Sequence, residues 1–113
     1  MFELTRAIPD VEALLALEPE ELGAKLLFLL RMRNFQNGIF NPSSLNAELW
    51  PFSPLPNQQP PYPRHRQDDI DQALSEAWGW LEAQGLIVPD AGINGQNGWK
   101  RLSRRVFGDQ RHE

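Results

Sequence analysis

Hydrophobic side chains recur at helical spacing in the first third of the chain. Within residues 10–33, Leu22, Leu26 and Leu29 mark one stripe, which Phe28 widens. A stripe this broad indicates a helix that contacts more than one neighbour. We therefore expect it to lie in the core of the domain.

Two local signals divide this region into two helices. Asp10 can cap a short first helix, because its carboxylate accepts hydrogen bonds from unpaired N–H groups. The second helix is expected to begin at Pro19, since proline has no N–H to leave unpaired in a first turn. Arg31 and Arg33 then fall in its last turn, where cations interact favourably with the helix dipole.

The clearest helical pattern spans residues 68–84. Its buried face is made of apolar side chains at positions 70, 74, 77, 78 and 81. Asp68 or Asp69 can cap its start, and Gly85 can supply a left-handed C-cap.

A short hairpin is predicted after that helix. Residues 86–88 are apolar, and two of the three are β-branched, which favours a strand. Pro89 is expected to end this strand. The glycine- and asparagine-rich residues 91–98 have the composition of a hairpin tip. Residues 99–106 are expected to form the return strand, and residues 107–113 a flexible tail.

The middle of the chain, residues 34–66, is irregular. Six prolines between Pro51 and Pro63 exclude a continuous helix or a central strand. A short helix is possible at residues 43–49, capped by Ser43 or Ser44. Apolar residues as far as Phe52 are expected to pack on the core, and residues 53–66 to form a mobile loop.

Composition favours a single domain spanning residues 1–113. The chain has no cysteine, which excludes disulfides and thiolate metal sites. No apolar run approaches the roughly 20 residues needed to span a bilayer, and no signal peptide is visible. We expect a cytoplasmic protein with no membrane partner.

The last third resembles the winged-helix pattern. Residues 81–87 (Leu-Glu-Ala-Gln-Gly-Leu-Ile) match the helix end and first strand, and residues 102–105 (Leu-Ser-Arg-Arg) match the end of the hairpin. Val106 stands where the pattern has glycine. The resemblance implies a mainly α fold with a small β-hairpin, a single winged-helix-like domain with a long proline-rich loop. Such domains bind DNA, dock proteins or dimerise.

The chain is also similar to the N-terminal region of uncharacterised bacterial proteins that carry a C-terminal Ymh-type domain linked with phage defence. The similar segments are residues 14–22, 76–86, 97–99 and 102–105. The resemblance implies a stand-alone or an excised front module, and it carries no catalytic residues with it.

DNA binding through the basic wing is one hypothesis. The candidate phosphate-contacting residues are Lys100, Arg101, Arg104 and Arg105. The helix that would enter the major groove, however, has five carboxylates off its buried face, at positions 68, 69, 71, 76 and 82. These would repel the closely spaced phosphates of a duplex. The net charge of −4 also argues against a strongly basic nucleic-acid binder.

Protein docking or self-association is the preferred hypothesis. The candidate interface residues are Trp80, Trp99 and Arg101, because tryptophan and arginine are enriched in interface hot spots. The alternative is that the proline-rich segment covers both rings. Residues 60–63 (Pro-Pro-Tyr-Pro) likewise favour a covering segment over a polyproline ligand.

Nothing in the sequence indicates an enzyme. His65 and His112 lack a carboxylate at ligand-like helical spacing, and the aspartates near position 70 lack the pattern of a calcium loop. No phosphate loop or dinucleotide motif is present. We predict a non-enzymatic winged-helix-like interaction module with no cofactor, no metal and no small-molecule substrate; the alternative is DNA binding through the wing.

Overall fold

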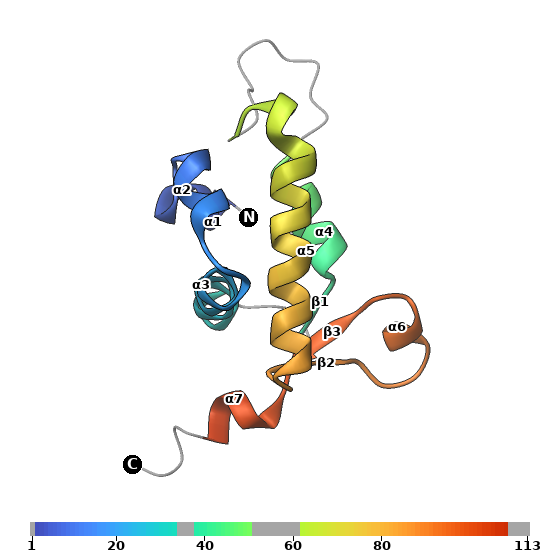
Figure 1. Cartoon of the computed structure of the whole chain (residues 1–113). Coiled ribbons are helices and arrows are strands. Elements are labelled where there is room, and N and C mark those ends of the chain that lie inside the picture. Colours follow the sequence, from blue (N-terminus) through green and yellow to red (C-terminus); the bar gives the residue numbers. More distant parts are fainter. Residues whose placement is uncertain (1, 34–37, 51–61, 109–113) are drawn as a thin grey trace.

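The computed structural model describes residues 2–33, 38–50 and 62–108. The protein is mainly helical with a small antiparallel sheet, as predicted (Figure 1). Its elements follow one another as α1 (Phe2–Ala7), α2 (Val11–Ala16), α3 (Pro19–Met32), β1 (Ile39–Phe40), α4 (Pro42–Ala47), η2 (Arg64–Arg66), α5 (Gln67–Ala83), β2 (Ile87–Pro89), α6 (Ile93–Gln96), β3 (Lys100–Leu102) and α7 (Arg104–Gly108).

The long helices α3 and α5 form the most extensive helix–helix contact among these elements. Helices α1 and α2 lie on the same side of α5 as α3, and α4 lies on another side (Figure 1). The inward faces of α3 and α5 supply a large part of one continuous core, including Leu22, Leu26, Leu74 and Leu81. These side chains are fully or almost fully buried, which confirms the predicted stripe on α5 and the Leu22 and Leu26 positions on α3. Of the other predicted positions on α3, Leu29 is only partly buried and Phe28 is exposed.

The predicted starts of α2 and α3 are confirmed. Asp10 Oδ1 accepts a hydrogen bond from the N–H of Glu12 at 3.1 Å. Helix α3 begins at Pro19 and has a capping box, in which the N–H of Glu18 donates to Glu21 Oε1 at 3.0 Å. Helix α1 was not predicted; its Leu4 is completely buried in the same core.

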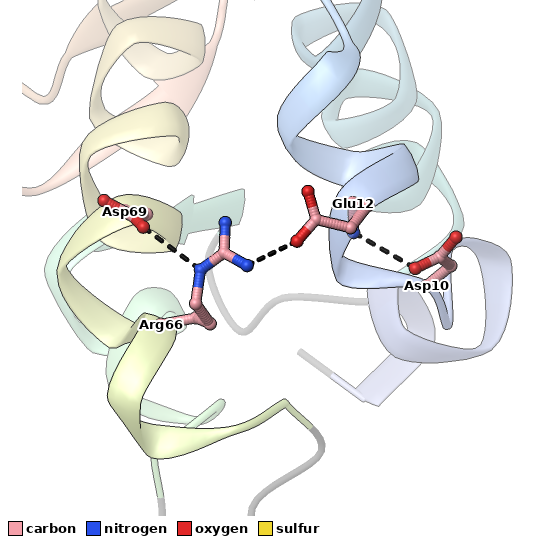
Figure 2. Close-up of polar contacts among 4 residues, drawn as sticks. All are labelled: Asp10, Glu12, Arg66 and Asp69. Carbon is pink, nitrogen blue, oxygen red and sulfur yellow. Dashed lines mark hydrogen bonds and ion pairs between the residues drawn. The ribbon is translucent and has the colours of Figure 1, made fainter.

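The predicted cap of α5 is wrong. The helix begins at Gln67, and neither Asp68 nor Asp69 caps it; Arg66 holds the N-cap position, and its side chain makes no capping hydrogen bond. Figure 2 shows the Arg66 guanidinium between Glu12 of α2 and Asp69 of α5, with an ion pair to each. These carboxylates hold the pKa of Arg66 above its ordinary value, Glu12 contributing most. The side chain thus joins α2 to the start of α5.

The predicted end of α5 is confirmed. Gly85 has a φ of +71°, a left-handed conformation that side chains with a Cβ rarely adopt. The N–H of Gly85 donates to Glu82 O, and the N–H of Leu86 donates to Leu81 O, each at 3.0 Å. This pair of bonds is the Schellman arrangement, which turns the chain from α5 into β2.

The sheet has three strands rather than the predicted two, in the order β1-β3-β2. Both pairings are antiparallel, with Phe40 opposite Lys100 and Val88 opposite Arg101. We call β2, α6 and β3 the wing; it projects away from the helices (Figure 1). The sequence of helices and strands from α3 to β3, with this strand order, is winged-helix-like.

The predicted return strand at residues 99–106 is too long. Strand β3 ends at Leu102, and the chain then enters α7, where Val106 is buried. A glycine at this position would leave that part of the core unfilled, which gives a physical reason for the departure from the winged-helix pattern. Of the predicted tail, residues 107 and 108 belong to α7, and residues 109–113 lie outside the described residues.

Residues 38–50 pack on the core as predicted, with Phe40, Leu45 and Leu49 buried. The predicted cap of α4 is wrong: Asn41 Oδ1, not Ser43 or Ser44, accepts from the helix, at 3.0 Å from the N–H of Ser43.

The predicted loop at residues 53–66 has a defined structure from residue 62 onward. Tyr62 is buried and its hydroxyl donates to Ile8 O at 2.7 Å; residues 64–66 form η2. Residues 53–61 lie outside the described residues.

Candidate interaction surfaces

Two of the predicted phosphate-contacting cations are ion-paired. Lys100 Nζ lies 3.2 Å from Glu82 Oε1, and Arg101 Nη2 lies 2.7 Å from Asp90 Oδ1. A hydrogen bond from Asn94, with a further contribution from Arg101, holds the pKa of Asp90 below its ordinary value. Carboxylates therefore compensate much of the positive charge that Lys100 and Arg101 could offer to a phosphate.

The other two predicted cations begin α7. Arg105 Nη1 donates to Gln84 O at 2.8 Å. Arg104 is exposed and has no ion-pair partner in the part of the chain that the structure describes. Both line an open surface hollow of about 550 Å³ that contains three arginines and no carboxylate. Its lining consists of Gly85, Val88, Arg101, Leu102, Ser103, Arg104 and Arg105.

The face of α5 that points away from the core is acidic. Asp68, Asp69, Glu76 and Glu82 are exposed. Asp71 is half-buried, and its Oδ1 accepts from Trp50 Nε1 at 3.0 Å. Two of these carboxylates have cationic partners, Asp69 in Arg66 and Glu82 in Lys100. A duplex placed along α5 would therefore meet a surface with several negative charges.

The two tryptophans predicted for an interface are half-buried. Trp80 packs against the core, and its ring lies over Gly23 of α3: a Cβ at that glycine would be only 2.9 Å from Trp80 Cε3. Trp99 lies between α6 and β3, just beyond the paired strands, where its carbonyl oxygen accepts from the N–H of Asp90 at 2.9 Å. Helix α3 thus shields part of the Trp80 ring, and residues 51–61 of the proline-rich segment lie outside the described residues.

Two of the three exposed large apolar side chains in the described residues belong to α3, and the third, Ile93, lies in α6. Phe28 and Met32 are 62% and 71% exposed and lie one turn apart, with the exposed Ala24 one turn before them. A neighbouring apolar hollow of about 330 Å³ is lined by Ala7, Ala24, Lys25, Phe28 and Leu29. We call the outward surface formed by Ala24, Phe28 and Met32 the α3 face.

Sequence analysis did not identify the α3 face as a site. The sequence feature that could have indicated this face was the broad apolar stripe of α3, which predicted more than one neighbour for the helix. The structure places α5 and α1 against α3, and leaves Phe28 uncovered by the described residues.

Titratable groups do not assemble into a metal site in the described residues, where no three His, Cys, Asp or Glu side chains lie close enough to share an ion. His65 is exposed in η2, and His112 lies outside the described residues. None of the helices described has the length and apolar character required to cross a membrane.

Comparison with known proteins gives no relative: no family model, no curated protein and no solved structure matches the chain. The similarity to proteins with a Ymh-type domain therefore stays a prediction, and the function has to be argued from the surfaces themselves.

Proposed function

We propose that this protein is a non-enzymatic interaction module that self-associates through the α3 face. The observation that carries the proposal is the exposed pair Phe28 and Met32 on the outward side of a helix whose inward side is already packed. Contact with a second copy would remove this apolar surface from water, at about 25 cal/mol per Å².

The charges around the α3 face favour a second copy over an unrelated partner. Exposed acids, Glu20 and Glu21, lie in the first turn of α3, and the exposed bases Lys25 and Arg31 lie further along. An antiparallel pair of α3 helices places the acidic end of one against the basic end of the other. A parallel pair would place like charges together.

One register satisfies both the shape and the charge of the α3 face. If two antiparallel α3 helices cross at the level of residue 26, Phe28 of one copy lies opposite Ala24 of the other. Arg31 then lies opposite Glu21. Each contact occurs twice because a two-fold interface is the same patch on both partners. Small residues opposite large ones allow the helices to approach closely.

The dimer is expected to be weak. Helix α3 has 14 residues and is therefore about 21 Å long. A standard interface buries about 800 Å² on each partner, more than this helix alone supplies. We therefore expect dissociation constants in the range of roughly 10 μM to 1 mM, corresponding to about −7 to −4 kcal/mol.

Sedimentation equilibrium over a wide concentration range tests the proposal. The wild type should show a concentration-dependent dimer, and Phe28→Ser should weaken it at least about tenfold. Ile93→Ser is the matched control, since Ile93 is 71% exposed but lies in the wing. It should dimerise like the wild type. A wild type that stays monomeric at about 1 mM, or an equal effect of Ile93→Ser, overturns the proposal.

Charge exchange tests the orientation. Arg31→Glu should weaken the dimer several-fold, because it places acids opposite acids. Adding Glu20→Arg, in the same acidic turn as Glu21, should restore part of the affinity; Glu21 itself is kept because its side chain completes the capping box of α3. If the double variant is weaker still, the two helices do not pair in an antiparallel manner.

We do not propose DNA binding as the function of this protein. Lys100 and Arg101 already have carboxylate partners, and the exposed face of α5 is acidic. The expected cytoplasmic location remains part of the proposal.

A further inference from the structure

The hollow where β3 meets α7 has features of an anion site that self-association does not use. We propose that it binds the phosphoryl group of a small phosphate ester. Three arginines, at positions 101, 104 and 105, line this hollow, and no carboxylate does. Arginine suits this ligand because its planar guanidinium can donate two parallel hydrogen bonds to phosphate oxygens.

The arginines keep donors available for a ligand. Arg105 uses Nη1 for Gln84 O, which fixes its guanidinium beside Gly85; a Cβ at that glycine would be 3.8 Å from Nη1. Arg101 uses Nε and Nη2 for Asp90. Since each guanidinium has five N–H groups, most donors of Arg105 and one nitrogen of Arg101 remain. Arg104 has no partner in the described residues and keeps all five.

Ser103 supplies a second, independent observation. It lines the same hollow, and its Oγ is buried without a hydrogen-bond partner among the described residues. Buried hydroxyl groups are usually satisfied, because leaving one unpaired is costly. A phosphate oxygen in the hollow could accept a hydrogen bond from Ser103 Oγ and remove that cost.

The surroundings favour a small ester over a nucleic-acid backbone. The hollow, at about 550 Å³, has the size of a small-molecule pocket. The apolar Val88 and Leu102 in its lining can contact the organic part of an ester. Beyond it, Lys100 is paired with Glu82, so within the described residues of the wing the positive charge does not continue as a track along which a polyanion could bind.

Calorimetric titration with phenyl phosphate, inorganic phosphate and a short DNA duplex at constant ionic strength tests the proposal. We expect phenyl phosphate to bind more tightly than inorganic phosphate, because it also contacts apolar lining residues. Arg104→Gln should weaken binding at least about tenfold, and Ser103→Ala about threefold to tenfold. Amide signals of residues 85 and 103–105 should shift on binding.

Lys100→Gln is the matched control, since it removes one wing charge outside the hollow. It should leave phenyl phosphate affinity unchanged. An equal loss in Lys100→Gln and Arg104→Gln would overturn the proposal, because it would indicate general electrostatic attraction. The proposal would also be overturned if the protein bound the duplex but did not bind phenyl phosphate at about 10 mM. Thermal melting of each variant separates lost binding from lost folding.

Discussion

The helical body (α1 to α5) and the wing differ in what holds each of them together. In the body, Leu22, Leu26 and Leu74 are almost fully buried in one continuous core. The body also has ion pairs, such as Arg33 with Glu48, but their side chains remain about a third exposed. In the wing, Ile87 is the fully buried side chain. Strands β2 and β3 are joined by backbone pairing and by the partly exposed ion pair of Arg101 with Asp90, and Lys100 pairs with Glu82 of α5.

Because of this difference, we expect the two regions to bind different kinds of ligand. Apolar burial is non-directional and insensitive to salt, so a well-packed body can leave an apolar surface such as the α3 face for a partner. Exposed ion pairs contribute little to stability and are screened by salt. The wing can therefore exchange such contacts for an anion at little cost to the fold.

The largest expected effect comes from the same substitution made in both regions. Leu26→Ala should lower the free energy of unfolding by about 2–5 kcal/mol, since Leu26 is completely buried. Leu102→Ala in β3 should cost clearly less, because Leu102 is only partly buried. Urea unfolding of the two variants makes the comparison. Equal losses would show that the wing is as much a part of the cooperative core as α3.

The next effect concerns Tyr62, which ties the start of α5 to α1 and α2. Tyr62→Phe removes the hydrogen bond to Ile8 O and leaves that oxygen unpaired, so it should cost about 1–3 kcal/mol. Chemical denaturation at neutral pH measures this loss. The same substitution on an exposed residue would be almost neutral.

Alkaline pH gives a second test of Tyr62. Burial raises its pKa to about 12, from an ordinary value of 10. The unfolded chain thus loses the proton first, and stability that is complete below pH 10 falls as the pH rises toward 12. Because the chain has one tyrosine, tyrosinate absorbance follows this group alone. Tyr62→Phe should abolish that part of the alkaline loss; a tyrosine that titrates near 10 would contradict it.

The long helices α3 and α5 were more predictable than the sheet because their signals are local. Pro19, the spacing of Leu22 and Leu26, and Gly85 each act within a few residues along the chain, and all three predictions are confirmed. Strand β1 has only two residues and exists because it pairs with β3, more than fifty residues later. No local pattern in so short a segment could indicate that pairing.

The candidate surfaces were only partly predictable for the same reason. The basic residues of the wing are visible in the sequence, but their partners Glu82 and Asp90 become neighbours only through the turns of the fold. Trp80 looked available for an interface because Gly23, which lets its ring pack on α3, is distant in sequence. Phe28 belongs to a run of apolar residues in which only the position of α5 separates inside from outside.

A pair of glycine substitutions tests that packing directly. Gly23→Ala places a Cβ 2.9 Å from Trp80 Cε3, so the ring must shift, and we expect a loss of about 1 kcal/mol. Gly79→Ala in α5 meets no atom within 4 Å and should gain about 0.5–1 kcal/mol from its higher helix propensity. Thermal unfolding with tryptophan fluorescence measures both. Equal stabilisation by the two variants would show that α3 does not hold the Trp80 ring.

The smallest expected effect is local to the wing. The pKa of Asp90 is lowered in the folded protein. The stability that its carboxylate contributes to the wing is therefore present above the ordinary pKa of 3.8 and is lost as the pH falls through the lower folded-state value. Asp90→Asn should remove this dependence by weakening the contact with Arg101. Hydrogen exchange, corrected for its intrinsic pH dependence, should show faster opening of the wing amides in the variant at neutral pH. The wild type should approach the same rates only in acid.

The amides of α3 and the midpoint of global unfolding should not change, because the exposed ion pair is separate from the buried core. If the α3 amides open together with those of the wing, the division between a body held by burial and a wing held by charges is wrong.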